Sequence, residues 1–582
     1  MTVRPSSSRA AALSIALALA PTAARADTYP RQNGIDIRHY AFTLAISDTS
    51  PEIAGEAAVD VRFVQPGVTT VSLDLASASN GKGMTVQSVT GNGSAVAFTH
   101  TGGVLRLQIA PSPAAGEERR FTIVYGGTPA NGLRILKNKY GEWSVFSENW
   151  PNRAREWLPM IDHPYDKATS EFIVTAPSAY QVVANGRLQS EIDRADGRRV
   201  THWKQSVPIA SWLNALGIER FAVRYLGEVK GVPLSTWVAH QDDEAGRIYF
   251  APARQALEFF SEHVGPYPYE KLANVAAAGL SGGTEHASAI FYGETGVRAA
   301  PATGLVAHEI AHQWFGNSVT EADWDEVWLS EGFATYFTLL FTEHTAGREA
   351  FVAGLKSART RALSAEKARP GIAIVHDNLA DMSKVLSPLV YQKAGWFLHM
   401  LRGTVGTDAF WRGIREYYRR HRDASATGDD LRRIMENASG QDLTWLFDQW
   451  LRRPVTPSFE GTWAYDAAAK AIRVELAQTQ PGDPYRVQVQ LGIVTAAGQP
   501  PRVERIEMKD QRIAVTIPAA AEPADVIFDP DTWLLANAVT FTRAKTPARE
   551  RQRGSHANGA GPGAHASERA GGSGGAKPPD TR

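Results

Sequence analysis

Cysteine is absent from the 582 residues of this chain. Disulfide bonds, thiol catalysis and cysteine-ligated metal sites are therefore excluded. No segment approaches the roughly 20 consecutive apolar residues of a membrane-spanning helix, so no integral membrane span is expected. Lys plus Arg and Asp plus Glu both number 61, and nothing in this balance indicates a nucleic-acid partner. The length predicts about three to four domains.

The N-terminus has the features of a secretory signal peptide. Arg4 and Arg9 precede an apolar run over 10–20, and a small-x-small pattern ends at Ala26. We therefore expect cleavage of residues 1–26 and a mature protein that is periplasmic or secreted. A paired arginine is missing, which favours the general export route. An uncleaved anchor or a disordered leader is the alternative.

Both ends of the remaining chain have the pattern of β-strands. Residues 27–225 are predicted to form an N-terminal β-sandwich-like domain, because short segments alternate apolar and polar residues between turn residues. Residues 453–542 return to this pattern and are predicted to form a small C-terminal β-sandwich. The clearest strands are expected at 40–46, 58–64, 121–125, 472–476 and 485–491.

The middle of the chain, residues 226–452, has the periodicity of helices. Besides two helices that carry the motif described next, helices are predicted over 249–264, 392–403, 409–421, 427–438 and 443–451. The fold class is therefore α+β with several domains.

The last segment, 543–582, has no aromatic residue and no Leu, Ile, Val or Met. Such a segment cannot offset its ordering entropy by burial, so we expect a disordered polar tail. It is mildly basic, which leaves open a plain solvated tail or a weak attraction to an anionic envelope surface.

The segment His308-Glu309-Ile310-Ala311-His312 has the pattern of a zinc site. Two histidines four residues apart lie on one face of a helix, where both rings can reach one metal ion. Glu309 is one residue further round, which keeps its carboxylate off the metal but within reach of a water, as a general base requires. This helix is predicted to begin at Thr303 and to end at Gly316-Asn317.

Glu331 is the expected third metal ligand. Eighteen residues separate it from His312, and it begins a second apolar helix predicted from about Ser330 to a stop at Gly347. Three protein ligands leave a fourth position for water, which is the mark of a catalytic zinc site. The alternative is a chance pentapeptide on an amphipathic helix. Cobalt or manganese could occupy the same ligands in vitro.

Several motifs in order resemble the aminopeptidase N family of gluzincin zinc metallopeptidases, to which leukotriene hydrolase also belongs. The resemblance covers most of the chain. It rests on the segments Ala154–Pro159 and Asp162–Pro164, Pro266–Leu272, Gly282–His286, His308–Asn317, Trp328–Ala334 and Tyr391–Gly395.

The resemblance implies a thermolysin-like α/β catalytic domain with one Zn²⁺ per chain, and peptides with a free N-terminus as substrates. It implies that Glu285 binds the α-ammonium of the peptide and that Tyr391 donates its hydroxyl to the oxyanion. The alternatives for these two are an edge-strand surface glutamate and a core tyrosine. The strand beside the substrate would further contain Gly282, Gly283, Thr284 and His286.

This sequence departs from the family at several pocket positions. Thr284 replaces the usual Met, His286 the usual Asn, and Ser330 the common Asn before the third ligand. Trp150 occupies the position, five residues before Arg155, that often supplies Gln or Glu. Glu148 lies nearby and is a candidate substitute, although an ordinary exposed glutamate is equally consistent. These departures mean that the sequence does not indicate which first residue of a peptide substrate the pocket prefers.

The largest departure is at the C-terminal end, where we expect no large helical domain. The active site would then be more open than in members that enclose the cleft, and it would lack any arginine from such a domain for the C-terminal carboxylate of a peptide.

Two other function classes stay open. A zinc epoxide hydrolase of the leukotriene hydrolase type would use the same metal site, but it needs a shaped lipid tunnel about which the sequence is silent. A non-catalytic peptide-binding protein is the second alternative. The oligomeric state and the physiological substrate cannot be predicted.

Overall fold

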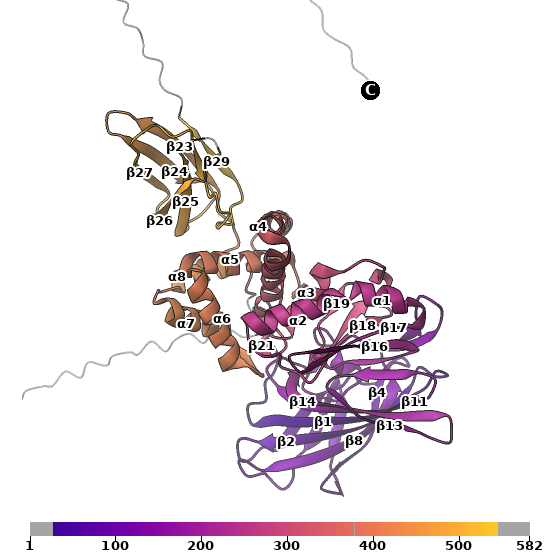
Figure 1. Ribbon diagram of the computed structural model, residues 1–582. Coiled ribbons are helices and arrows are strands. Elements are labelled where there is room, and N and C mark those ends of the chain that lie inside the picture. The colour runs from indigo at the N-terminus through magenta and orange to yellow at the C-terminus, as the bar shows by residue number, and fades with distance from the viewer. Residues whose placement is uncertain (1–26, 377–378, 497, 545–582) are drawn as a thin grey trace, which may run out of the picture.

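The computed structural model describes residues 27–376, 379–496 and 498–544. The predicted signal peptide (1–26) and all but the first two residues of the predicted polar tail lie outside the described residues. Every helix among the described residues is too short or too polar to cross a membrane. Figure 1 shows two β-rich ends and a largely helical middle, with the C-terminal sheets standing apart from the N-terminal ones.

The N-terminal part is built on an eight-stranded sheet of order β13-β14-β11-β1-β2-β8-β4-β5. Its neighbours are antiparallel except for the parallel pair β1 and β11. The strands are β1 (Ile35–Ile46), β2 (Ile53–Phe63), β4 (Gly83–Gly91), β5 (Ser94–Ala95), β8 (Glu118–Thr128), β11 (Lys167–Pro177), β13 (Arg187–Asp193) and β14 (Arg198–Ala210).

Two smaller sheets share the core of this sheet, with orders β3-β7-β6 and β12-β15-β10-β9. Alternate side chains of β1, β2 and β11 are buried, as the period of a half-buried strand requires. The predicted N-terminal sandwich-like fold is confirmed. The strands are β3 (Thr70–Asp74), β6 (Phe98–Thr101), β7 (Val104–Gln108), β9 (Leu133–Lys137), β10 (Trp143–Ser147), β12 (Gln181–Ala184) and β15 (Leu216–Glu219).

The middle part of the chain, which contains the predicted catalytic domain, begins with a mixed five-stranded sheet of order β16-β17-β18-β20-β19. Strand β16 crosses residue 225, where the sequence predicted a domain boundary, and pairs with β17. The short strand β19 lies at the sheet edge and contacts helix α3. The strands are β16 (Phe221–Val229), β17 (Val232–Ala239), β18 (Leu272–Ala277), β19 (Gly283–Thr284) and β20 (Ala289–Gly293).

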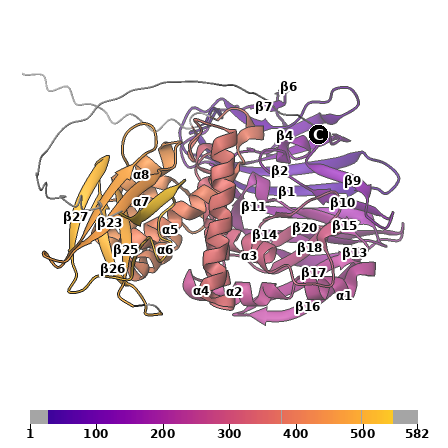
Figure 2. The same ribbon diagram turned by 90° about the horizontal axis from the view of Figure 1, so that it is seen from above.

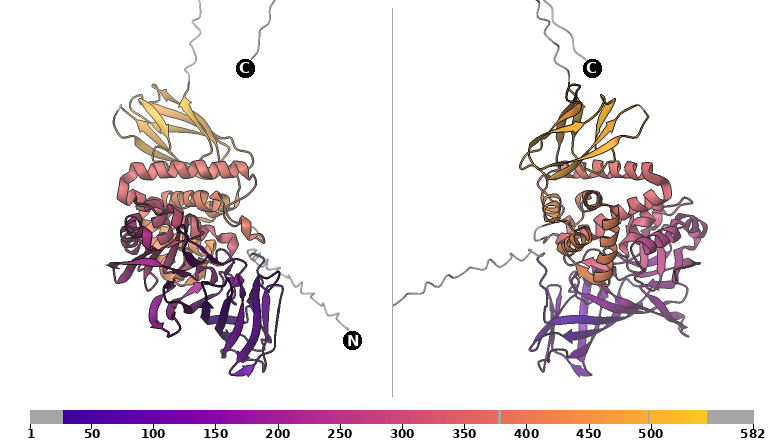
Figure 3. Two further views of the ribbon diagram at one scale, coloured as in Figure 1. Left: turned by 90° about the vertical axis from the view of Figure 1, so that its right-hand side faces the viewer. Right: turned by 60° about the vertical axis from the view of Figure 1, so that its left-hand side comes forward.

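Four helices follow or flank this sheet: α1 (Asp243–Tyr249), α2 (Pro252–His263), α3 (Thr303–His312) and α4 (Trp328–Ala368). Helix α4 is the long helix in both views of Figure 3. It contains one residue with non-helical backbone angles, Gly347 (φ 83°, ψ 176°), at the place where the sequence predicted a stop. The chain therefore changes direction at Gly347 and continues as helix.

The later helices are η6 (Met382–Lys384), the π-helical turn η7 (Leu389–Lys393), α5 (Ala394–Val405), α6 (Thr407–His421), α7 (Gly428–Ser439) and α8 (Thr444–Arg452). Of these helices, η7 and α5 pack against α4, α7 packs against α6, and α8 packs against α5. Figure 2 shows this group from above, between α4 and the C-terminal sandwich. A short parallel pair, β21 (Val319–Glu321) and β22 (Ala424–Ala426), ties α6 back to the segment after α3.

The C-terminal sandwich has a four-stranded sheet of order β27-β24-β23-β29 and a three-stranded sheet of order β26-β25-β28. This confirms the predicted small β-sandwich. Its strands are β23 (Phe459–Asp466), β24 (Ala471–Gln478), β25 (Val487–Val494), β26 (Arg502–Met508), β27 (Arg512–Pro518), β28 (Asp525–Phe528) and β29 (Val539–Arg543).

Candidate active site

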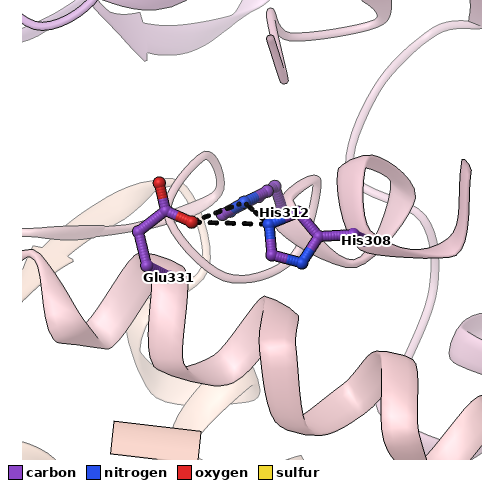
Figure 4. A group of neighbouring side chains, drawn as sticks. All are labelled: His308, His312 and Glu331. Carbon is purple, nitrogen blue, oxygen red and sulfur yellow. Dashed lines mark hydrogen bonds and ion pairs between the residues drawn. The ribbon is translucent and has the colours of Figure 1, made fainter. Parts of the chain in front are cut away.

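Three side chains from α3 and α4 converge on one point. The Nε2 atoms of His308 and His312, one turn apart on α3, are 3.2 Å from each other. The Oε2 atom of Glu331, in the first turn of α4, is 3.4 Å from His308 Nε2 and 3.3 Å from His312 Nε2. Figure 4 shows the carboxylate pointing at both rings.

This triangle fits a tetrahedral zinc ion. Bonds of about 2.0–2.2 Å place neighbouring ligand atoms roughly 3.3–3.6 Å apart, close to the three distances observed. The Oε2 atom of Glu331 is buried and has no hydrogen-bond partner, so it lacks the contact that a cation would supply. Burial opposes ionisation of Glu331, but the His312 and His308 rings outweigh it and hold its pKa below the usual range.

The ring of His312 is oriented by contacts of its second nitrogen, Nδ1, which is directed away from the ligand triangle. Its Nδ1 atom lies 3.2 Å from the Phe315 carbonyl oxygen and 3.1 Å from Ser330 Oγ. A proton donated from Nδ1 to the carbonyl leaves the Nε2 lone pair facing the ligand triangle. Gly316 permits this packing, because its φ is 101° and a Cβ there would overlap Ser330 Oγ. Ser330, which replaces the common Asn, therefore still contacts the ligand.

Glu309 lies beside the triangle, on the same helix. Its side chain is 4 % exposed, and burial followed by the charge of Glu285 raises its pKa well above the usual value. Strand β19 packs closely against the Glu309 side chain: a Cβ on Gly283 would overlap the Glu309 carboxyl group. A buried carboxylate with a raised pKa is suited to accept a proton and return it.

Glu285 follows β19 and lies in the same cavity. It is 5 % exposed, and its Oε1 atom has no hydrogen-bond partner. Burial raises the pKa of Glu285 to about 7, although the charge of His312 acts to lower it. One ligand atom each of Glu285, Glu309 and His312 lie within 4.8 Å of one another. Trp150, at the position of the expected Gln or Glu, lines the same cavity as the predicted amine anchor.

Tyr391 lies in the π-helical turn η7 and completes the group. Its ring stacks on His308 with centroids 6.2 Å apart, and its hydroxyl is within the electrostatic influence of the Glu331 carboxylate. Burial and this carboxylate raise the pKa of Tyr391, so its hydroxyl keeps its proton and can donate it in a hydrogen bond. π-Helical turns are frequent at functional sites.

These groups line a cavity of about 450 Å³. Of the predicted strand residues, Gly283, Thr284 and Glu285 line it. Gly282 and His286 are not among its lining residues. Gly282 forms the turn before β19, with a φ of 73° and its carbonyl bonded to the Gly293 N–H.

His286 is a core residue. It is fully buried, its ring packs edge-on against Phe291 at 4.8 Å between centroids, and burial lowers its pKa to about 3. It is therefore packed into the core and not exposed to the cavity that Glu285 lines.

Glu148 lines the cavity but its carboxylate is already paired. Arg134 Nη2 donates to its Oε2 at 3.0 Å, and Arg153 Nη1 donates to the same oxygen. Arg153 also lines the cavity and was not predicted. The segment from Met382 to Leu386 adds an apolar part of the wall, which the sequence could not indicate because it has no repeating pattern.

The model of the peptidase M1 N-terminal domain matches residues 37–213, and that of the peptidase family M1 domain matches residues 250–450. Leucyl aminopeptidase of Saccharolobus solfataricus is 28% identical over 345 residues, which are 56% of this chain and 43% of that protein. Glutamyl aminopeptidase of Sus scrofa is 25% identical over 320 residues, or 52% of this chain and 34% of that protein. The chain thus spans less than half the length of these curated relatives.

Among solved structures, the chain is similar to an M1 zinc metallopeptidase from Deinococcus radiodurans. The TM-score is 0.63 and the sequence identity 25%, and the match covers 73% of this chain and 95% of that one. A structure of a mutant of that protein, bound to a Tyr-Ser-Ala substrate, matches with the same TM-score and identity.

Proposed function

We propose that this chain, which belongs to the peptidase M1 family, is a zinc-dependent aminopeptidase with one zinc ion per chain. One observation carries the proposal: a single cavity contains the His308, His312 and Glu331 triangle, Glu309 beside it, and the buried carboxylate of Glu285, whose Oε1 atom has no hydrogen-bond partner. Zinc held by the triangle supplies a Lewis acid that polarises a peptide carbonyl and acidifies water.

Three side chains of the protein bind the substrate, transfer the proton and stabilise the oxyanion. Glu285 binds the α-ammonium of the peptide, because a buried carboxylate forms a strong charge-assisted contact with a fixed ammonium. Glu309 accepts the proton of the attacking water and passes it to the leaving amine. The Tyr391 hydroxyl donates a hydrogen bond to the carbonyl oxygen as negative charge develops there. The products are a free amino acid and a peptide shortened by one residue.

The replacement Glu309→Gln tests this assignment. Hydrolysis of aminoacyl substrates should fall by roughly 10²–10⁴, because the general base is lost. Zinc content, measured by metal analysis, should stay at one per chain, because Glu309 is not in the ligand triangle. The matched control is Glu219→Gln, a glutamate of β15 that is 1 % exposed and lies outside the cavity. Near-normal hydrolysis by zinc-loaded Glu309→Gln would contradict the assignment.

A further inference from the structure

Two amide side chains hold the backbone that carries Glu285. Gln313 Nε2 donates to the Glu285 carbonyl oxygen at 3.0 Å, and Asn317 Nδ2 donates to the same oxygen at 2.5 Å. The other end of the Gln313 amide accepts from the Ser288 N–H at 2.9 Å and from the Tyr267 hydroxyl at 3.2 Å. Gln313 therefore uses both ends of its amide on the segment that includes the proposed amine anchor.

Both amides lie just after the end of α3, the helix of the two histidine ligands. Gln313 directly follows His312, and the Asn317 N–H donates to the His312 carbonyl at 3.1 Å. Both side chains are fully buried. Each therefore links the backbone next to a metal ligand to the backbone of the anchor through one side chain.

The N-terminal part of the chain holds the same segment from its other side. Asn185 Nδ2 donates to the Ala287 carbonyl oxygen at 2.6 Å, and the Gly186 N–H donates to Ser288 Oγ at 2.7 Å. The backbone of residues 285–288 is thus bonded on two sides and has little freedom to shift along the cavity.

We infer that Gln313 and Asn317 are positioning residues that fix the distance between the amine anchor and the metal ligands, and thereby limit cleavage to the first peptide bond. This rests on the proposed function of Glu285. In a peptide the amino nitrogen is only about 2.5 Å from the carbonyl carbon of its own residue, and successive residues are about 3.8 Å apart. An anchor that moved by half that spacing would no longer distinguish the first carbonyl from the second.

The test measures recognition of the amino group directly. In zinc-loaded Glu309→Gln protein, calorimetry gives the dissociation constants of trialanine and N-acetyl-trialanine, and their ratio reports the preference for a free amine. We expect Gln313→Met and Asn317→Ala each to reduce this ratio at least tenfold, with zinc content unchanged. Adding Glu285→Gln instead should abolish the preference.

Gln449→Met is the matched control. Gln449 in α8 also uses both ends of its buried amide on one backbone residue, Arg486, at 2.6 and 3.1 Å, but it lies outside the cavity. It should leave the ratio unchanged.

If Gln313→Met or Asn317→Ala folds, binds zinc and keeps the parent's ratio of dissociation constants, the inference is overturned, while the role of Glu285 as amine anchor is unaffected. Loss of zinc from both variants would also overturn it, because these residues would then support the metal. Equal binding of both peptides by the Glu309→Gln parent would overturn both the role of Glu285 as amine anchor and the positioning role of Gln313 and Asn317.

Discussion

At the residue scale, the charges of the cavity explain which ligands it needs. Glu285, Glu309 and Glu331 are each at most 5 % exposed, and all three line the same cavity. Like charges this close in a poorly solvated site repel strongly, which is why burial and neighbouring carboxylates raise the pKa of Glu309. A zinc ion and one substrate ammonium together carry the three positive charges that would balance three carboxylates.

The contact between Gly283 and Glu309 provides a prediction at this scale. The change Gly283→Ala adds a methyl group that overlaps the Glu309 carboxyl group, so the base must move. We expect turnover to fall by roughly 10–10³, since a small misplacement of a catalytic group costs about 10². Steady-state kinetics with parallel metal analysis measures this, and zinc binding should be retained.

Gly304→Ala serves as its control. Gly304 is in the first turn of α3, the helix that carries Glu309, and a Cβ there meets no atom within 4 Å. Unchanged turnover in Gly283→Ala would show that Glu309 does not need its position beside β19.

Spacing along the helix determines part of the geometry of the site. The helical repeat brings His308 and His312 together, and the structure places Glu331 beside them. The sequence could not reveal that His286 turns into the core or that Arg153 pairs with Glu148. Both outcomes depend on neighbours that only the folded chain brings together.

At the element scale, local signals located most helices well. The predicted helices over 409–421 and 427–438 correspond to α6 and α7, and Thr427 caps α7 through a reciprocal capping box with Asp430. Helix α3 begins at Thr303, as predicted, but it ends at His312, before the predicted stop at Gly316-Asn317. The π-helical turn η7, which holds Tyr391, has no sequence signature because it depends on packing against α4.

Gly347 gives a prediction for α4. Its backbone angles, φ 83° and ψ 176°, lie in a region that is essentially restricted to glycine. The change Gly347→Ala should therefore destabilise the fold by about 1–3 kcal/mol, measured by denaturant unfolding, although a Cβ there meets no atom within 4 Å. Hydrolysis should be unaffected, because Glu331 lies in the first turn of α4. A stability equal to or above that of the parent would mean that α4 does not bend there.

At the scale of the whole molecule, buried polar contacts join the N-terminal sheets to the catalytic part. Lys167 at the start of β11 donates to the Asn317 and Ser318 carbonyl oxygens at 3.0 and 2.8 Å and to Thr320 Oγ1 at 2.9 Å. Asp27 accepts from the Trp324 N–H at 2.9 Å. These partners are about 150 or more residues apart in the chain, so no local pattern could have predicted them.

Lys167 supports a prediction about domain association. Lys167→Met removes a donor from three acceptors. The Asn317 carbonyl oxygen still accepts from Thr320 Oγ1, but the Ser318 carbonyl oxygen loses the donor Lys167, and an orphaned buried acceptor costs about 1–3 kcal/mol. We expect a lower midpoint of thermal unfolding, and a loss of activity at temperatures where the parent is still active. Lys204→Met, which removes a half-exposed lysine of β14 that pairs with Glu171, should change the midpoint little. Equal midpoints for both variants would argue against Lys167 as a link between the two parts.

The most direct measurement of the central claim is hydrolysis of a panel of aminoacyl-fluorophore substrates, each with a free and an acetylated amino terminus, before chelation, after chelation and after zinc restoration. A zinc aminopeptidase should cleave only the free substrates, lose this activity with the chelator and regain it with zinc. Equal cleavage of acetylated substrates would contradict the role of Glu285. Activity indifferent to chelation, or no cleavage by the zinc-loaded protein, would contradict the proposed function itself.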